Sequence, residues 1–76
     1  MAFKIGTKQT AKAVEQRSAV AVYVADDADP KLTTRIVERS LQAGIEVIGV
    51  ETMKHLGQMC GIEVGAAMAA WVPDEE

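Results

Sequence analysis

Four runs of apolar residues divide the chain. Residues 19–25, AVAVYVA, are continuously apolar and rich in β-branched side chains, and residues 45–50, IEVIGV, show a similar pattern. Runs of this kind predict central strands that are covered on both faces. Residues 3–5, FKI, and residues 66–72, AAMAAWV, predict one more strand near each end of the chain.

The segments between these runs have the apolar spacing and the end signals of helices. The predicted helices cover residues 8–17, 30–43 and 53–60. Thr7 and Thr52 are expected to cap the first and the third of these helices. Asp29 before Pro30 predicts an N-cap followed by proline at the first helical position, and Gly44 predicts the end of the same helix.

The predicted order is therefore β-α-β-α-β-α-β with short connections. Strands that alternate with helices and are apolar on both faces indicate an α/β fold. We expect a three-layer α/β/α sandwich with a small mixed four-stranded sheet, formed as one domain by residues 1–76.

Composition supports a globular domain, because 49% of the 76 residues are hydrophobic. The chain has one cysteine, Cys60, so no intrachain disulfide is expected. No apolar run approaches the roughly 20 residues of a membrane span, and the start does not resemble a secretory signal. We expect a cytoplasmic protein without a membrane partner.

The charge is unevenly distributed along the chain. The net charge of −3 by itself argues against a nucleic-acid binder. Residues 1–24, however, carry four basic residues and one acidic residue, whereas residues 25–76 carry four basic and ten acidic residues. The two segments thus have net charges of +3 and −6. Two interpretations of this segregation stay open: a surface for an anionic partner, and chance.

The sequence offers no convincing catalytic or metal-binding group. His55 and Cys60 are five residues apart on one predicted helix, which places them on different helix faces. Asp26, Asp27 and Asp29 form a cluster whose expected roles are turn and cap. We therefore expect no enzyme, metal, cofactor or small-molecule substrate.

Residues 6–14, GTKQTAKAV, open the first predicted helix with a polar and basic turn. A helix N-terminus offers unpaired N–H groups and the positive end of the helix dipole, so this segment could hold a phosphate. The amide of Gln9 could also bond a purine edge. The segment lacks the spacing of a P-loop or a dinucleotide fingerprint. An ordinary capped helix remains the alternative for this segment alone.

Two segments together resemble a known family. IGTKQTAKAV, followed at a distance by LGQMCGIEVGAA, resembles the kink-turn RNA-binding ribosomal proteins of the L7Ae type, and the bacterial branch of that family looks closest. The likeness extends over residues 3–72, and the second segment is the more specific one. The resemblance implies an α/β/α fold and a non-enzymatic protein that binds RNA bent at tandem sheared G·A pairs and a bulge.

The resemblance also implies roles for individual residues. The match places a first group at the helix N-terminus that meets the G·A pairs: Gly6, Thr7, Lys8, Gln9 and Lys12. A second group matches the loop that packs on the extruded nucleotide: Gly61, Ile62, Glu63 and Val64. Glu51 and Lys54 are secondary candidates. Many archaeal and eukaryotic members have Asn-Glu where this chain has Lys-Gln.

The predicted partner is an RNA that contains a kink-turn, such as ribosomal RNA, a riboswitch or a structural RNA, and ribosome association is expected. Family members usually begin with a helix before the first strand, whereas two residues precede Phe3 here. Two expectations follow: either one sheet face is less covered, which favours marginal stability or self-association, or the usual helix precedes the residues of this sequence. Two alternatives rank below RNA binding. The second-ranked function is a protein-interaction or assembly module with little RNA binding, and the third is an enzyme acting on a phosphorylated small molecule.

Overall fold

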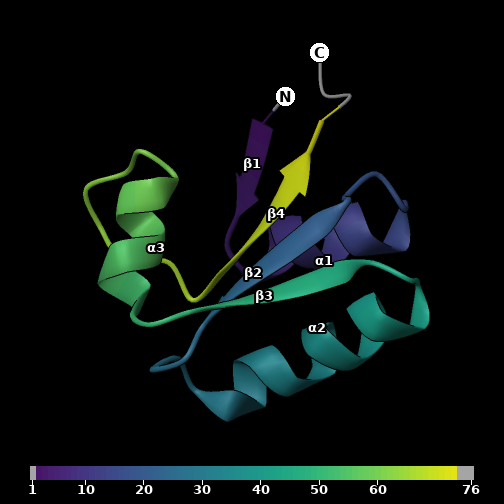
Figure 1. The fold of residues 1–76 in the computed structure, drawn as a ribbon, viewed down its shortest axis with the longest axis horizontal. Coiled ribbons are helices and arrows are strands. Elements are labelled where there is room, and N and C mark those ends of the chain that lie inside the picture. The colour runs from purple at the N-terminus through teal and green to yellow at the C-terminus, as the bar shows by residue number, and fades with distance from the viewer. Residues whose placement is uncertain (1, 74–76) are drawn as a thin grey trace.

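The computed structural model describes residues 2–73. Its seven elements follow one another in the predicted order (Figure 1). They are β1 (Ala2–Ile5), α1 (Thr7–Glu15), β2 (Ala21–Ala25), α2 (Pro30–Gln42), β3 (Glu46–Val50), α3 (Met53–Met59) and β4 (Met68–Val72).

The four strands form one mixed sheet in the order β1-β4-β2-β3. β2 and β3 are parallel, whereas β4 pairs antiparallel with both β1 and β2. β1, β2 and β3 therefore run in one direction, and their last residues lie on the same side of the sheet as the start of β4. We call this side the C-terminal edge. Every connection that carries a predicted site residue leaves from it or returns to it.

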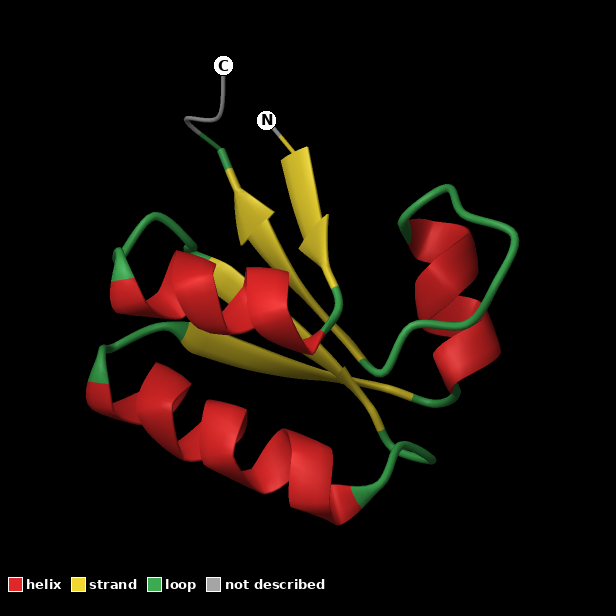
Figure 2. Ribbon diagram, turned by 180° about the vertical axis from the view of Figure 1, so that it is seen from behind, coloured by secondary structure: helices red, strands yellow, loops and turns green. Residues whose placement is uncertain are grey.

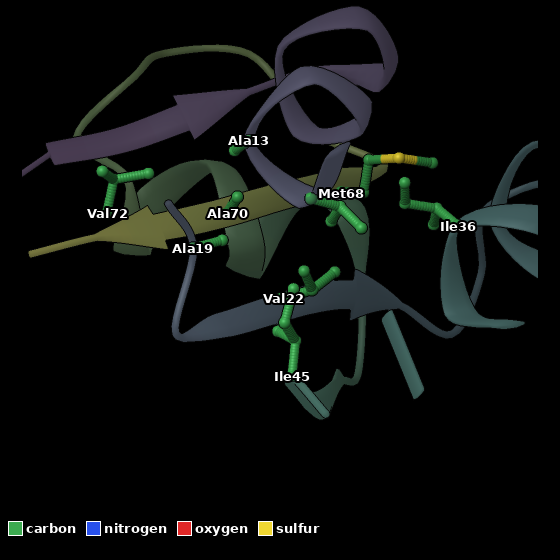
Figure 3. Close-up of a cluster of buried hydrophobic side chains, with 9 residues drawn as sticks. Ala13, Ala19, Val22, Ile36, Ile45, Met68, Ala70 and Val72 are labelled. Atoms are coloured by element: carbon green, nitrogen blue, oxygen red, sulfur yellow. The ribbon is translucent and has the colours of Figure 1, made fainter. Parts of the chain in front are cut away.

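Helices cover the sheet on both faces, which confirms the three-layer fold (Figure 2). α1 and α2 lie side by side on one face and bury Val14 and Ile36 against Val22 and Met68 of the sheet. Figure 3 shows Ile36, Val22 and Met68 in this cluster. α3 lies on the other face, where Leu56 is fully buried in a second cluster. Alternation along the two central strands supplies both clusters, since Val22 and Met68 belong to the first cluster and Tyr23 and Ala69 to the second.

The start of α1 differs from the prediction. Thr7 is the first residue of the helix rather than its cap, and Gly6 occupies the N-cap position without a side-chain hydrogen bond. The turn from β1 into α1 gives Gly6 a φ of 95°, in a region that glycine enters without strain. The Gly6 N–H donates to the Met68 carbonyl at 3.1 Å, which ties this turn to β4.

The other two predicted N-caps are confirmed. The Asp29 side chain accepts from the Lys31 N–H at 2.9 Å, and the Thr52 hydroxyl oxygen accepts from the His55 N–H at 3.0 Å. β4 begins two residues later than predicted because the Ala66 N–H donates to the Met53 carbonyl of α3, at 3.0 Å, rather than to a strand.

The face that carries α3 is incompletely covered within residues 2–73. α3 packs near the C-terminal edge, over Ala25 and Ala69. Farther from that edge, the ring of Phe3 meets those of Tyr23 and Trp71 edge-on, with centroids 5.7 and 4.8 Å apart. All three rings remain half-buried. No helix in the described part of the chain is long and apolar enough to cross a membrane.

Candidate nucleic-acid interface

The C-terminal edge brings the predicted site segments into one region. α1 begins directly after β1, the segment with Glu51 and Lys54 follows β3, and the loop between α3 and β4 returns along α3 to the start of β4 (Figure 1). Segments that are far apart in the sequence are thus neighbours because the strands that lead to them are parallel, and β4 starts where the others end.

The N-terminus of α1 is open. Gly6 provides no side chain to cap it, and Thr7, which was expected to do so, lies inside the helix. The first backbone bond of the helix runs from the Thr10 N–H to the Gly6 carbonyl, at 2.9 Å. The N–H groups of the first helical turn, which precede Thr10, are therefore available to an acceptor from outside. Thr7, Lys8 and Gln9 are all exposed around them.

Basic and amide side chains border two hollows along α1. Lys12 and Gln9 line both of them: one of about 170 Å³ toward β1, which includes Lys4, and one of about 400 Å³ beside Lys8. Lys12 lies one turn after Lys8 on the same exposed side of the helix. The arrangement offers positive charge for phosphates and, in Gln9, a group that can both donate and accept.

The α3–β4 loop is held against α3 by backbone contacts. Gly61 has a φ of 78° and turns the chain, after which the Ile62 N–H donates to the Gly57 carbonyl at 3.0 Å. At Gly57 an added Cβ would lie 2.0 Å from the Val64 carbonyl oxygen. The loop can pack this closely only because Gly57 has no side chain.

The two apolar residues of this loop have different surroundings. The side chain of Ile62 is half-buried and packs against the cluster around Leu56. Val64, in contrast, is 71% exposed. Glu63 between them is exposed as well. Both apolar residues were predicted to pack on an extruded nucleotide, and the structure presents Val64 to solvent while Ile62 also anchors the loop.

Glu51 and Lys54 are exposed where the chain passes from β3 into α3. The start of α3 is fixed by Asp27, whose carboxylate accepts from the Met53 N–H at 2.8 Å. This contact joins the β2–α2 connection to α3, and it was not foreseen. Gly57 was also not assigned to the site, although an isolated glycine within a helical pattern is a recognisable sign of close packing.

The structure does not bring His55 and Cys60 together in the arrangement that nucleophilic catalysis requires. His55 is exposed, and Cys60 is half-buried at the end of α3. Burial raises the pKa of the Cys60 thiol, which disfavours the reactive thiolate. Within residues 2–73, no group of three or more His, Cys, Asp or Glu side chains could hold a metal ion.

The fold and this edge define a class of protein, a small α/β domain that presents an open helix start and an apolar loop beside one end of its sheet. The model of the ribosomal protein L7Ae/L30e/S12e/Gadd45 family matches residues 2–76, so the chain belongs to that family. The family membership that the two sequence segments predicted is thereby confirmed.

Individual relatives agree with this assignment. The chain is 48% identical over 66 residues to a Bacillus pumilus protein named RNA-binding protein, and the match covers 87% of this chain and 80% of that one. It is 44% identical over 70 residues to the large ribosomal subunit protein eL8 of Halobacterium salinarum, with 91% of this chain and 58% of that protein covered.

Among solved structures, the chain resembles the Giardia lamblia 15.5kD RNA binding protein, with a TM-score of 0.89 and 24% sequence identity. That match covers 97% of this chain and 62% of the other. At this identity the likeness establishes the fold alone.

Proposed function

We propose that this protein is a non-enzymatic RNA-binding protein that recognises kink-turns and stabilises their bent form. The observation that carries the proposal is that the open α1 N-terminus and the loop with Val64, which leads into β4, both adjoin the C-terminal edge of the sheet. Membership of the L7Ae/L30e/S12e/Gadd45 family and the names of several relatives support RNA as the partner.

The proposed contacts follow from the chemistry of each segment. Lys8 and Gln9 would meet the guanine edges of the sheared G·A pairs, and Lys12 would meet the phosphate backbone. Regular A-form RNA has a major groove too narrow for side chains, so a protein reads the groove where the duplex is distorted. The distortion at a kink-turn would admit the start of α1.

The α3–β4 loop would contact the extruded nucleotide of the bulge. The exposed side chain of Val64 and the accessible part of Ile62 form an apolar surface suited to the flat face of an unstacked base. Contacts that exist only with the bent RNA favour that conformation over the straight ensemble, which is a shift of population. The protein would therefore act by binding alone.

The targets we propose are ribosomal RNA, a riboswitch or another structural RNA that contains the motif. Similarity to the ribosomal protein eL8 supports association with the ribosome. Such targets place the protein in the cytoplasm.

The test is a titration of the protein with two RNA duplexes that differ only at the G·A pairs. The duplex with tandem G·A pairs and a bulge should bind far more tightly than the one in which Watson–Crick pairs replace the G·A pairs. With a donor dye on one arm and an acceptor dye on the other, energy transfer should report bending of the first duplex when protein is added. Equal affinity for the two duplexes would contradict kink-turn recognition.

The half-buried aromatic rings of the sheet favour a second candidate function, a self-associating assembly module. Phe3, Tyr23 and Trp71 present apolar surface that a second copy of the chain could cover. Sedimentation over a range of protein concentrations tests this candidate. A monomeric mass throughout, together with RNA binding, would reject it.

A further inference from the structure

The positive charge of this protein is concentrated in one layer. α1 and α2 together carry five of the eight basic residues of the chain and two of its eleven acidic residues. This layer has a net charge of +3, whereas the remainder of the chain has −6. The charge that seemed segregated along the sequence is thus segregated in space, on the face formed by two adjacent helices. The kink-turn contacts proposed above use the basic residues of α1 alone.

The basic residues of α2 differ in their surroundings. Arg39 forms an ion pair with Glu15 of α1, with 3.0 Å between Nη1 and Oε1. Lys31 and Arg35 lie in the first two turns of α2, are exposed, and form no ion pair within residues 2–73. Because α2 starts just after β2 ends, these two residues lie toward the C-terminal edge and Arg39 lies farther from it.

A hollow of about 300 Å³ connects α2 to the start of α1. Thr7 and Ala11 line it from α1, and Arg35 and Ile36 line it from α2. The ion-paired Glu15 and Arg39 line it as well. The side chain of Arg35 thus borders the same depression as the first residue of the open helix N-terminus. Among the acidic residues that precede α2, Asp29 and Asp27 accept backbone hydrogen bonds at 2.9 and 2.8 Å.

We propose that the RNA interface extends across this hollow onto α2, where Lys31 and Arg35 contact phosphates of one duplex arm beyond the bend. The proposal rests on the proposed function. A bent duplex has two arms that leave the bend in different directions, and each presents a regular row of negative charge. Lys31 and Arg35 belong to a helix layer with a net charge of +3, and the hollow links Arg35 to Thr7 at the proposed start of the RNA interface. This placement favours an RNA arm over an acidic protein as the occupant.

The test compares Lys31→Ala and Arg35→Ala with the matched variant Arg17→Ala, which removes one exposed charge beyond the opposite end of α1. Affinity for the kinked duplex is measured over a series of salt concentrations. Each α2 variant should bind roughly twofold to fivefold more weakly, and the slope of log Kd against log salt should fall by about one. Arg17→Ala should change neither quantity as much. Arg35→Lys, which retains the charge, should preserve the slope.

A second measurement identifies the arm. The kinked duplex is prepared with one arm or the other cut back to a few base pairs. The loss of affinity caused by Arg35→Ala should disappear with one of the two shortened duplexes. The loss of affinity caused by Lys12→Ala should remain with both. The α2 contact is overturned if Arg35→Ala lowers the affinity no more than Arg17→Ala does. It is also overturned if the loss of affinity in Arg35→Ala is the same with both shortened duplexes. Either result would leave α2 to another partner, such as an acidic protein.

The two proposals fail in different ways. If the wild-type protein does not prefer the kinked duplex over its Watson–Crick counterpart, the proposed function itself fails. If that preference is intact and the α2 variants match their control, only the extension onto α2 is rejected.

Discussion

Gly57 permits the α3–β4 loop to lie against α3, so Gly57→Ala is the most direct perturbation of that loop. The added Cβ would lie 2.0 Å from the Val64 carbonyl oxygen and 3.2 Å from the Gly65 Cα. Real Cβ atoms essentially never come within 3.0 Å of such an atom. The Val64 carbonyl must therefore move by about 1 Å or more, and it belongs to backbone rather than to a flexible side-chain end.

The effect on stability is the difference between two opposing terms. Overpacking of a close contact costs about 1–3 kcal/mol. Alanine at an interior helix position, however, is more favourable than glycine by about 1 kcal/mol. The net loss should thus be about 0–2 kcal/mol. For a domain of this size that corresponds to a fall in Tm of up to roughly 16 °C, so the variant should still fold at room temperature.

The effect on RNA binding should be larger than the effect on folding. Val64 is 71% exposed, so most of its side chain is available for burial against a base. Full burial of a valine side chain contributes about 1.5 kcal/mol or more, and 1.4 kcal/mol corresponds to a tenfold change in affinity. If the displaced loop no longer presents Val64 correctly, affinity for the kinked duplex should fall about tenfold.

The assay is a titration of the kinked duplex with Gly57→Ala, Val64→Ala and the control Gln58→Ala, combined with thermal unfolding of each protein. Gln58 is the next residue of α3 and is exposed, so its replacement should leave the loop in place. Gly57→Ala should bind at least as weakly as Val64→Ala. Wild-type affinity and an unchanged Tm in Gly57→Ala would refute the reasoning, because the clash would then have been relieved without moving the loop.

Three further predictions concern single side chains. Lys12→Ala should weaken binding of all duplexes and lower the salt slope by about one, whereas Gln9→Ala should reduce the preference for G·A pairs; unchanged affinity in both variants would place the RNA site elsewhere. Thr10 is fully buried and its hydroxyl donates to the Lys4 carbonyl at 3.3 Å, so Thr10→Val should lower the free energy of unfolding by about 1 kcal/mol in urea titration. Burial raises the pKa of the Cys60 thiol, so alkylation of the folded protein should reach half its maximal rate at a higher pH than in urea, and coincident pH profiles would contradict this.

The elements of this fold could be predicted from the sequence because each has its own local signal. The apolar runs predicted all four strands, and Asp29 and Thr52 predicted where two of the helices begin. The insertion of β4 between β1 and β2 could not be read in this way, since strand order depends on pairing between distant residues. The cap at Thr7 was wrong because a tertiary bond, from the Gly6 N–H to the Met68 carbonyl, sets the path into α1.

Sequence reasoning could propose candidate site residues where those residues have distinctive chemistry. Lys8, Gln9 and Lys12 stand at a helix start, and the loop segment was recognised by its resemblance to a family. The contacts that hold the loop were not accessible. Gly57 acts through the absence of a side chain, and Asp27 acts on a backbone N–H that is 26 residues away in the sequence. Such roles depend on which segments of the chain lie in contact after folding, and these contacts cannot be read from a single sequence.

These supporting contacts bear on how tightly the edge could hold RNA. The Asp27 carboxylate fixes the start of α3, the Gly57 carbonyl holds the Ile62 N–H, and the Met53 carbonyl holds the Ala66 N–H. The loop is therefore fixed to α3 at both of its ends before any ligand arrives. Ordering a loop during binding costs about 0.5–1.5 kcal/mol for each side chain immobilised, and a loop that is already ordered avoids much of this cost. The ordering entropy would instead fall on the RNA, whose straight ensemble must bend, and this division of cost is what a protein that selects one RNA conformation requires.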